Sequence, residues 1–349
     1  MEPAMSTVIL SDARFSAHTW YGHPECADRL DAIMEALATS GLTDDLRSVA
    51  PNEAPEKALL AVHTPDLLWR IRHLSSFGGG QIDGDTYLTY DSWDAALYAA
   101  GAAMGAVDVA LARHPNNAFA LVRPPGHHAT PNRAMGFCLI NNVAVAARHA
   151  LNRYGLRRVA IVDYDVHHGN GTQDAFYDEP RVLFISTHAA PFYPGTGAMA
   201  EVGTPGPAAG TTLNIPLPFG VGDAGYAQVF DELVVPALRR FHPELLLVSA
   251  GYDSHWKDPL GPMTLSTSGY AHLTARLLDL AQELCQGRIA FILEGGYSLE
   301  ALGACTIATM RLLLGREPGP DLLGVPQTPG TSPRPQIEMI RQRHPLFAR

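Results

Sequence analysis

Short runs of consecutive apolar residues alternate along this chain with longer segments in which apolar residues recur every three or four positions. Six runs have the length and continuous apolar character of strands buried on both faces, at 118–122, 158–162, 182–186, 213–215, 245–248 and 289–293. Four segments have helical spacing, at 91–112, 140–154, 226–241 and 268–285. This alternation predicts an α/β fold with a central, mostly parallel sheet and helices on both faces.

The chain shows no internal repeat and no long low-complexity linker, so we expect one domain over residues 1–349. Within it, the Pro-rich tail 318–349 is expected to wrap the surface and to end in a short helix near 336–343. The Ala- and Gly-rich segment 95–112 is interrupted by Asp108, which favours a buried helix over a membrane span.

Charge and cysteine content narrow the class of protein further. The formal net charge is −10, and the 4 cysteines show no metal or disulfide spacing. We therefore expect no nucleic-acid partner, no membrane partner and a reducing, cytoplasmic location. Only Lys57 and Lys257 are lysines, and this Arg bias favours a GC-rich, bacterial source.

Polar and titratable residues follow several of the predicted strands directly. These include His127 and His128, then Asp163, Asp165 and His167, then Asp253, and finally Tyr297. Open α/β sheets bind ligands beyond the carboxyl ends of their strands, so we expect these side chains to line one site.

Two carboxylates and an imidazole at the carboxyl ends of these strands indicate a metal centre. Asp163, Asp165 and His167 alternate, so in extended chain they point to one face, where burial is costly without a cation. Adding Asp253 gives the set Asp165, His167 and Asp253. Three protein ligands with an open position are typical of a catalytic Zn²⁺ site, although Fe²⁺ or Co²⁺ would also fit. One such ion is predicted per chain, with the His127–His128 pair positioned for proton transfer.

Five longer motifs extend this pattern: RPPGHHA at 123–129, GFCLINNVAVAA at 136–147, VDYDVHHGNGTQ at 162–173, SAGYD at 249–253 and LEGGY at 293–297. Together they resemble the zinc-dependent histone deacetylase family, in particular its class II-like bacterial amidohydrolases, which are related to acetylpolyamine amidohydrolases. The resemblance implies an arginase/deacetylase-like three-layer fold. It also implies removal of acetyl or other acyl groups from acyl-lysine by metal-activated water.

The resemblance assigns roles to the catalytic residues. His128 would be the general base and then the acid toward the leaving amine, and Asn170 would orient it. His127 would be its electrostatic partner, oriented by Asp163. Tyr297 would donate a hydrogen bond to the developing oxyanion.

The resemblance also implies substrate and ion contacts. The substrate-binding residues would be Phe137, Tyr193, Gly136, Leu260, Asp85 and Gly296. Among them, Phe137 and Tyr193 would wall a narrow acyl-lysine tunnel, and Asp85 would accept hydrogen bonds from the substrate backbone. A structural K⁺ would be held, partly through main-chain oxygens, by Asp163, Asp165, His167, Ser186 and Thr187.

Three alternatives differ in specific residues. An acetylpolyamine amidohydrolase, which would take small acylated amines, stays open, although Leu260 stands where polyamine-selective relatives carry a Glu. A binuclear manganese enzyme of the arginase type is disfavoured because Gly169 and His255 replace two required aspartates. A catalytically silent binding module is disfavoured because every proton-transfer, metal and oxyanion residue is present.

Overall fold

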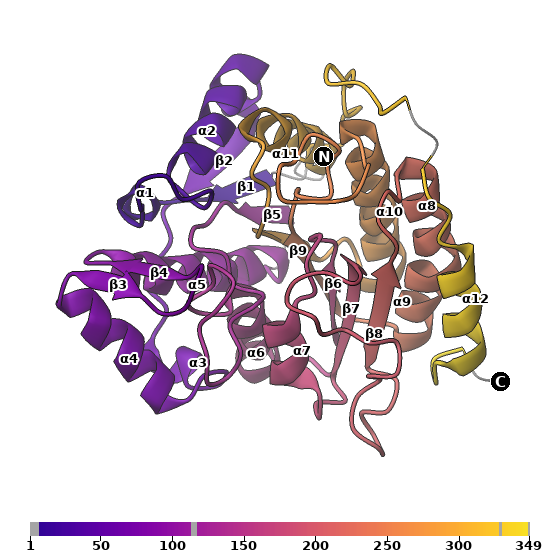
Figure 1. Cartoon of the computed structure of the whole chain (residues 1–349), viewed down its shortest axis with the longest axis horizontal. Helices are drawn as coiled ribbons and strands as arrows, with labels where there is room; N and C mark the ends of the chain where they lie inside the picture. The colour runs from indigo at the N-terminus through magenta and orange to yellow at the C-terminus, as the bar shows by residue number, and fades with distance from the viewer. Residues whose placement is uncertain (1–6, 113–116, 328–329, 348–349) are drawn as a thin grey trace.

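A computed structural model describes residues 7–112, 117–327 and 330–347 of the chain. Its centre is an eight-stranded sheet in which every neighbouring pair is parallel, in the order β2-β1-β5-β10-β9-β6-β7-β8 (Figure 1). These strands are β1 (Thr7–Leu10), β2 (Leu46–Val49), β5 (Asn117–Ala120), β6 (Val159–Asp163), β7 (Val182–Ala189), β8 (Thr212–Leu217), β9 (Leu245–Ala250) and β10 (Ile289–Leu293). A separate antiparallel pair is formed by β3 (Gly79–Gln81) and β4 (Tyr87–Thr89).

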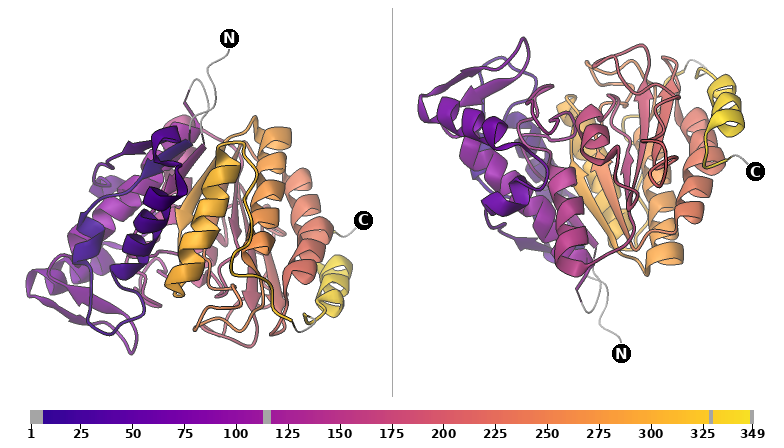
Figure 2. Two further views of the ribbon diagram at one scale, coloured as in Figure 1. Left: turned by 90° about the horizontal axis from the view of Figure 1, so that it is seen from above. Right: turned by 90° about the horizontal axis from the view of Figure 1, so that it is seen from below.

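Helices enclose the sheet on both faces, as the views from above and from below in Figure 2 show. Their bounds are α1 (Arg14–Ala17), α2 (Asp28–Ser40), α3 (Glu56–Leu59), α4 (Pro65–Ser76), α5 (Ser92–Ala110), α6 (Asn142–Tyr154), α7 (Asn170–Phe176), α8 (Asp223–Val229), α9 (Val235–Phe241), α10 (Thr267–Cys285), α11 (Leu299–Leu313) and α12 (Arg334–Arg343), with a 3₁₀ turn η1 (Thr43–Asp45) and a π-helical turn η2 (Phe230–Val234). α5 and α6 cover one face, and α8 to α11 cover the other, with α2 packed against α11. This arrangement confirms the predicted α/β class and its parallel sheet.

The apolar core explains why the strands read as continuous hydrophobic runs. All residues of β5, β6, β9 and β10 are buried because helices cover both faces of these strands. One apolar cluster extends from β1 to α12, and a smaller one lies under α3, α4 and the start of α6. Among the described residues, no helix combines the length and apolarity that crossing a bilayer requires.

Two helices that begin near the carboxyl edge of the sheet have defined caps. The side chain of Asn141 accepts a hydrogen bond from the Ala144 N–H at the start of α6, and Ser298 does the same for Ala301 at the start of α11. The caps fix where the preceding loops end, directly beside the polar segments 123–141 and 294–298.

The segment predicted as one helix at 226–241 is divided into α8, η2 and α9. The backbone is helical without a gap from 223 to 241. Pro236 lies in the first turn of α9 and has no N–H to donate to the preceding turn, so the regular α-helical hydrogen bonding is interrupted before it. The wider π turn at Phe230–Val234 absorbs this break.

Candidate active site

The carboxyl ends of β5, β10, β9 and β6 lie side by side in the middle of the sheet. The loops that leave these four strands bring together residues 123–129, 294–297, 251–253 and 163–170 at one edge. Residues more than 170 positions apart in the sequence therefore share one site, as the strand-end argument predicts.

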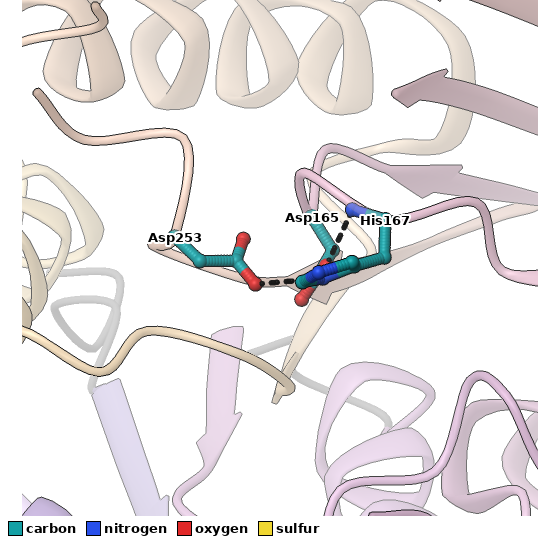
Figure 3. A group of neighbouring side chains, drawn as sticks. All are labelled: Asp165, His167 and Asp253. Atoms are coloured by element: carbon teal, nitrogen blue, oxygen red, sulfur yellow. Dashed lines mark hydrogen bonds and ion pairs between the residues drawn. The ribbon is translucent and has the colours of Figure 1, made fainter. Parts of the chain in front are cut away.

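Asp165, His167 and Asp253 form the deepest part of this site (Figure 3). One ligand atom from each of the three lies within 4.8 Å of the other two. Nδ1 of His167 lies 3.1 Å from Oδ1 of Asp165 and 3.2 Å from Oδ2 of Asp253. Both carboxylates are fully buried, and the imidazole is the part of the cluster that faces the pocket.

Two observations test whether this cluster suits a cation. Oδ2 of Asp253 is buried without a hydrogen-bond donor, and burial together with the Asp165 carboxylate raises the pKa of Asp253 to about 7. Gly295 leaves space beside the carboxylates, because a Cβ there would lie 2.1 Å from Oδ2 of Asp253 and 2.5 Å from Oδ2 of Asp165. The donor set and the open space fit a divalent metal ion.

Backbone N–H groups hold the two carboxylates in place. The Val166 N–H donates to Oδ1 of Asp253 over 2.7 Å, and the Gly295 N–H donates to Oδ2 of Asp165 over 2.8 Å. The His167 N–H also donates to Oδ1 of Asp165 over 2.9 Å. Both carboxylates are thereby oriented by the backbone, as is usual for metal-ligating side chains.

The tandem histidines lie beside this cluster, with their ring centroids 4.0 Å apart. Nδ1 of His127 donates to Oδ2 of Asp163 at 2.9 Å, and Nδ1 of His128 donates to Oδ1 of Asn170 at 2.8 Å. The second bond leaves Nε2 of His128 as the proton-accepting nitrogen.

Their environments drive the two pKa values apart. Burial favours neutral His127, but the Asp165 and Asp163 carboxylates outweigh it and raise the pKa of His127 well above its ordinary value. Burial, together with the positive charges of His127 and His167, lowers the pKa of His128 well below its ordinary value. Paired groups with opposite shifts are typical of acid–base sites.

A pocket of about 230 Å³ opens above these groups. Its walls include Tyr193, whose ring meets His128 edge-on at 5.1 Å, and Phe137, whose ring meets Tyr297 edge-on at 5.7 Å. The pocket is narrow, with aromatic side walls and polar groups at its base.

A tight turn at 135–138 places Phe137 in the wall. Gly136 and Phe137 both have left-handed backbone, with φ of +57° and +67°, and Met135 pairs with Cys138 across the turn. A Cβ on Gly136 would lie 2.5 Å from the His128 ring and 3.0 Å from Tyr193. Glycine is therefore needed here both for the turn and for the space in the pocket.

Tyr297 is fixed from behind by two charged residues. Oδ2 of Asp258 accepts hydrogen bonds from the Tyr297 and Ser298 N–H groups, over 2.6 and 3.0 Å. The Arg29 guanidinium lies 4.9 Å from the Tyr297 ring centroid, and its Nε donates to the Gly296 carbonyl at 2.7 Å. Burial raises the pKa of Tyr297 well above its ordinary value, which keeps the hydroxyl available as a donor.

Comparison with known proteins agrees with this geometry. The family model described as "Histone deacetylase domain" matches residues 23–313. The chain belongs to the histone deacetylase family.

Relatives of this histone deacetylase-family chain come from plants, archaea and bacteria. It is 42% identical to histone deacetylase 14, chloroplastic, of Arabidopsis thaliana, covering 90% of this chain and 78% of the relative. It is 45% identical to a probable deacetylase of Archaeoglobus fulgidus (80% and 77% covered) and 39% identical to a histone deacetylase-like amidohydrolase of Pseudomonas aeruginosa (84% and 77%). The crystal structure of the HDA15 HD domain superposes with a TM-score of 0.88 at 38% identity, covering 97% of this chain and 95% of that one.

These findings confirm the family resemblance and identify a hydrolase of the deacetylase type that acts on an acetylated substrate. The family is generally metal-dependent, and the Asp165, His167 and Asp253 cluster is the corresponding candidate centre.

Nearly all residues singled out from the sequence meet at this deacetylase site. Those that line the pocket are Asp85, His127, His128, Gly136, Phe137, His167, Tyr193, Leu260 and Tyr297. Asp165 and Asp253 lie beneath them, and Asp163 and Asn170 lie behind the tandem histidines. Gly296 is not part of the lining; its neighbour Gly295 is, and the Gly296 carbonyl is bound to Arg29.

The residues proposed for potassium also lie together. Asp163 on β6 is paired with Ser186 on β7, and the Thr187 hydroxyl is 3.5 Å from the Asp163 carbonyl oxygen. The Ser186 hydroxyl also contacts Nδ1 of His188 at 3.0 Å.

Sequence reasoning missed several residues of the site. Phe192 lines the pocket, with its ring stacked on His167 at 5.2 Å, and its position next to Tyr193 was the available signal. Glu294 holds the histidine loop through Oε2, which accepts hydrogen bonds from the Gly126 and His127 N–H groups over 2.7 and 3.1 Å. Arg29 has no motif signal, because it acts on backbone carbonyls far away in the sequence.

Proposed function

We propose that this chain is a zinc-dependent deacylase that removes acetyl or other acyl groups from the side-chain amine of acyl-lysine. The observation that carries the proposal is the position of His128. Its proton-accepting nitrogen is left free by the Nδ1 bond to Asn170, and its ring lines the same small pocket as His167 of the metal cluster. A base beside a metal centre, at the bottom of an aromatic-walled pocket, is the arrangement that amide hydrolysis requires.

Asp165, His167 and Asp253 would hold the ion, leaving the side that faces the pocket open. When bound, Zn²⁺ would polarise the acyl carbonyl and make a water molecule acidic enough to be deprotonated near neutral pH. The same ligand set would also accept Fe²⁺ or Co²⁺.

The chain's own groups would move the protons. His128 has a lowered pKa, is neutral at pH 7 and would take a proton from the attacking water at Nε2. It would then return that proton to the leaving amine. His127, charged and bound to Asp163, would add positive potential beside the developing negative charge.

Tyr297 would stabilise the oxyanion from the other side of the pocket. Its hydroxyl stays protonated, and the backbone bonds to Asp258 hold the residue in place before the substrate arrives. A preorganised donor of this kind typically contributes about 3 to 4 kcal/mol to the transition state.

The pocket suits the straight methylene chain of a lysine. Phe137 and Tyr193 present aromatic rings from opposite loops, and Leu260 adds an apolar contact. Asp85 also lines the pocket and would accept hydrogen bonds from substrate backbone N–H groups.

The position of Asp85 in the pocket also supports a second function, the deacetylation of polyamines. Its carboxylate could pair with the secondary ammonium of an acetylated polyamine, a role that the apolar Leu260 cannot fill. Deacetylation of small acetylated polyamines is therefore the alternative.

Two further expectations remain predictions. A structural K⁺ at Asp163, Asp165, His167, Ser186 and Thr187 would use oxygen ligands, which hard cations prefer. A cytoplasmic location and a bacterial source also stay predictions, because relatives include plant proteins named chloroplastic.

The test is turnover by zinc-loaded enzyme of matched acetyl-lysine peptides, longer acyl-lysine peptides, acetylputrescine and acetylspermidine. We expect higher kcat/KM on the acetyl-lysine peptides than on either polyamine. Higher kcat/KM on the polyamines would favour the alternative, and hydrolysis of none of these amides would overturn both.

A further inference from the structure

A second pocket, of about 310 Å³, lies next to the substrate pocket between α4 and the loop 130–134. Two arginines line it, Arg70 from α4 and Arg133 from the loop. Apolar side chains, including Ile71 and Ile82, line the remainder. We refer to it below as the arginine pocket.

Only a thin wall separates the arginine pocket from the substrate pocket. One side of the wall is the segment 82–86 and the other is the segment 133–137, joined by a 3.2 Å hydrogen bond from the Phe137 N–H to Oγ1 of Thr86. Asp85 and Phe137 face the substrate pocket, whereas Ile82 and Arg133 face the arginine pocket.

Both guanidinium groups retain free donors. Asp83 is the carboxylate nearest to Arg133, at 3.8 Å, which is too far for a direct hydrogen bond, and the Arg133 side chain is 62% exposed. The oxygen of Asp83 that faces Arg133 is Oδ2, whereas Oδ1 accepts hydrogen bonds from the Asp85 and Thr86 N–H groups. Arg70 has no carboxylate within 4.0 Å in the part of the chain that the structure describes.

One small pocket therefore holds Arg70 with no carboxylate within 4.0 Å among the described residues and Arg133 with a single carboxylate at 3.8 Å. A guanidinium group binds carboxylate or phosphoryl oxygens through paired N–H donors. Next to apolar walls, such a pair fits the side chain of an acidic residue, with its methylene groups on the wall and its oxygens on the arginines.

An extended peptide substrate is long enough to occupy both pockets at once. Arg133 precedes Gly136 by three residues, so their Cα atoms are at most about 11 Å apart. An extended peptide advances about 3.3 Å per residue, so a residue two or three positions from the acyl-lysine can reach the arginine pocket.

We propose that the arginine pocket binds an acidic side chain two or three residues from the acyl-lysine and so selects peptides with that spacing. This inference rests on the proposed acyl-lysine function and adds a substrate class to it. A polyamine carries only positive charge and would gain nothing from the two arginines.

The experiment compares acetyl-lysine peptides that differ only in Glu or Gln at one position, two or three residues to either side of the acetyl-lysine. For at least one position, we expect kcat/KM to be about three- to tenfold higher for the Glu peptide at low ionic strength, mainly through KM. The ratio should fall as salt is added, because the contact is exposed.

The double variant Arg70→Ala/Arg133→Ala should bring the Glu-to-Gln ratio close to one. Arg72→Ala is the matched control, since Arg72 is an exposed arginine on the same helix that does not line the pocket, and it should keep the wild-type ratio. A wild-type ratio of one at all four positions, or a ratio that survives the double variant, would overturn the arginine pocket while leaving the deacylase proposal standing. Absence of turnover on every peptide would remove both.

Discussion

Oδ1 of Asn170 lies 2.8 Å from Nδ1 of His128, whereas the neighbouring His127 has a carboxylate, Asp163, at the same position on its ring. Both partners accept from Nδ1 through an oxygen, so the two imidazoles differ in the charge of the partner, which is a carboxylate for His127 and a neutral amide for His128. Burial and the positive charges of His127 and His167 lower the pKa of His128, and its neutral partner does not stabilise an imidazolium as the Asp163 carboxylate does for His127.

Replacing Asn170 by Asp should remove this distinction. A carboxylate on Nδ1 should raise the pKa of His128 and move the acidic limb of the kcat/KM profile to higher pH, by about one unit. The measurement is kcat/KM against pH for wild type and Asn170→Asp. Asn152→Asp makes the same chemical change at an exposed position on α6 and should leave the profile in place; an unshifted limb in Asn170→Asp would argue against His128 as the base.

Removing the Tyr297 hydroxyl should weaken stabilisation of the transition state without reducing metal binding. We expect Tyr297→Phe to lower kcat by a factor of about 10² to 10³, with unchanged zinc content. Tyr154→Phe, which removes a hydroxyl that contacts Asp108 on the surface, serves as the control. Near-normal kcat in Tyr297→Phe would exclude the oxyanion role.

Closing the space at Gly136 should block the pocket. A methyl group there would overlap the His128 ring, at 2.5 Å, so Gly136→Ala should reduce kcat/KM by at least about tenfold. Gly155→Ala carries a similar backbone penalty at φ +65° but meets no atom within 4 Å, so it should lose stability and keep activity. Equal activity in the two variants would show that the clash is relieved by movement of the loop.

Removing the ion should destabilise the fold, because Asp165 and Asp253 are buried carboxylates that lose their counter-charge. We expect a chelator to lower the midpoint of thermal unfolding and zinc to restore it. Asp253→Asn should weaken zinc affinity by at least about tenfold, as measured by competition with a chromophoric chelator. Asp279→Asn, on the exposed face of α10, is the control and should bind zinc as the wild type does.

His63 should make the stability of the protein depend on pH. Its Nδ1 donates to the Thr130 carbonyl at 3.0 Å and its Nε2 accepts from the Asn141 N–H at 2.9 Å, an arrangement that needs the neutral ring. Burial lowers the pKa of His63 to about 4 in the folded state. The unfolded chain then binds more protons than the folded one between pH 4 and pH 6.5, so this contribution to stability is complete above pH 6.5 and is lost as pH falls toward 4.

Between pH 7.5 and pH 5 this should lower the free energy of unfolding by about 2 kcal/mol. The comparison is urea unfolding of wild type and His63→Gln at both pH values, since the variant lacks the titrating ring and the remaining groups are shared. The pH-dependent loss should be smaller in His63→Gln; an identical loss in both proteins would contradict this contribution of His63.

The fold class and the sheet edge that carries the site could be predicted because buried parallel strands have a simple sequence pattern. Each buried strand is a continuous apolar run, and the polar residues after it, such as Asp163 or Tyr297, must emerge at the same edge as all the others. β1 and β2 were not predicted; β2 is half exposed and lacks the continuous apolar run by which the other strands were recognised, and β1 is a short run near the start of the chain. The helix predicted at 226–241 is present, but its regular hydrogen bonding is interrupted by a π turn before Pro236, which periodicity alone does not indicate.

What the sequence could not predict is the support behind the site. Arg29 donates to the Glu294 and Gly296 carbonyls, contacts between a side chain and a distant backbone that require no particular residue at the accepting end. Asp258 and Glu294 act in the same way on N–H groups. Such bonds depend on the folded path of the chain, so they cannot be predicted from the spacing between residue types.

The place of β10 in the sheet has a consequence for synthesis of the protein. β10 is the last strand to be translated, yet it lies between β5 and β9. On the ribosome, β2-β1-β5 and β9-β6-β7-β8 therefore remain two unjoined ribbons, each with an open inner edge, until residue 293 has emerged. A nascent or truncated chain that stops before β10 already contains Asp165, His167 and Asp253, but has neither the strand that joins the ribbons nor the tyrosine that follows it.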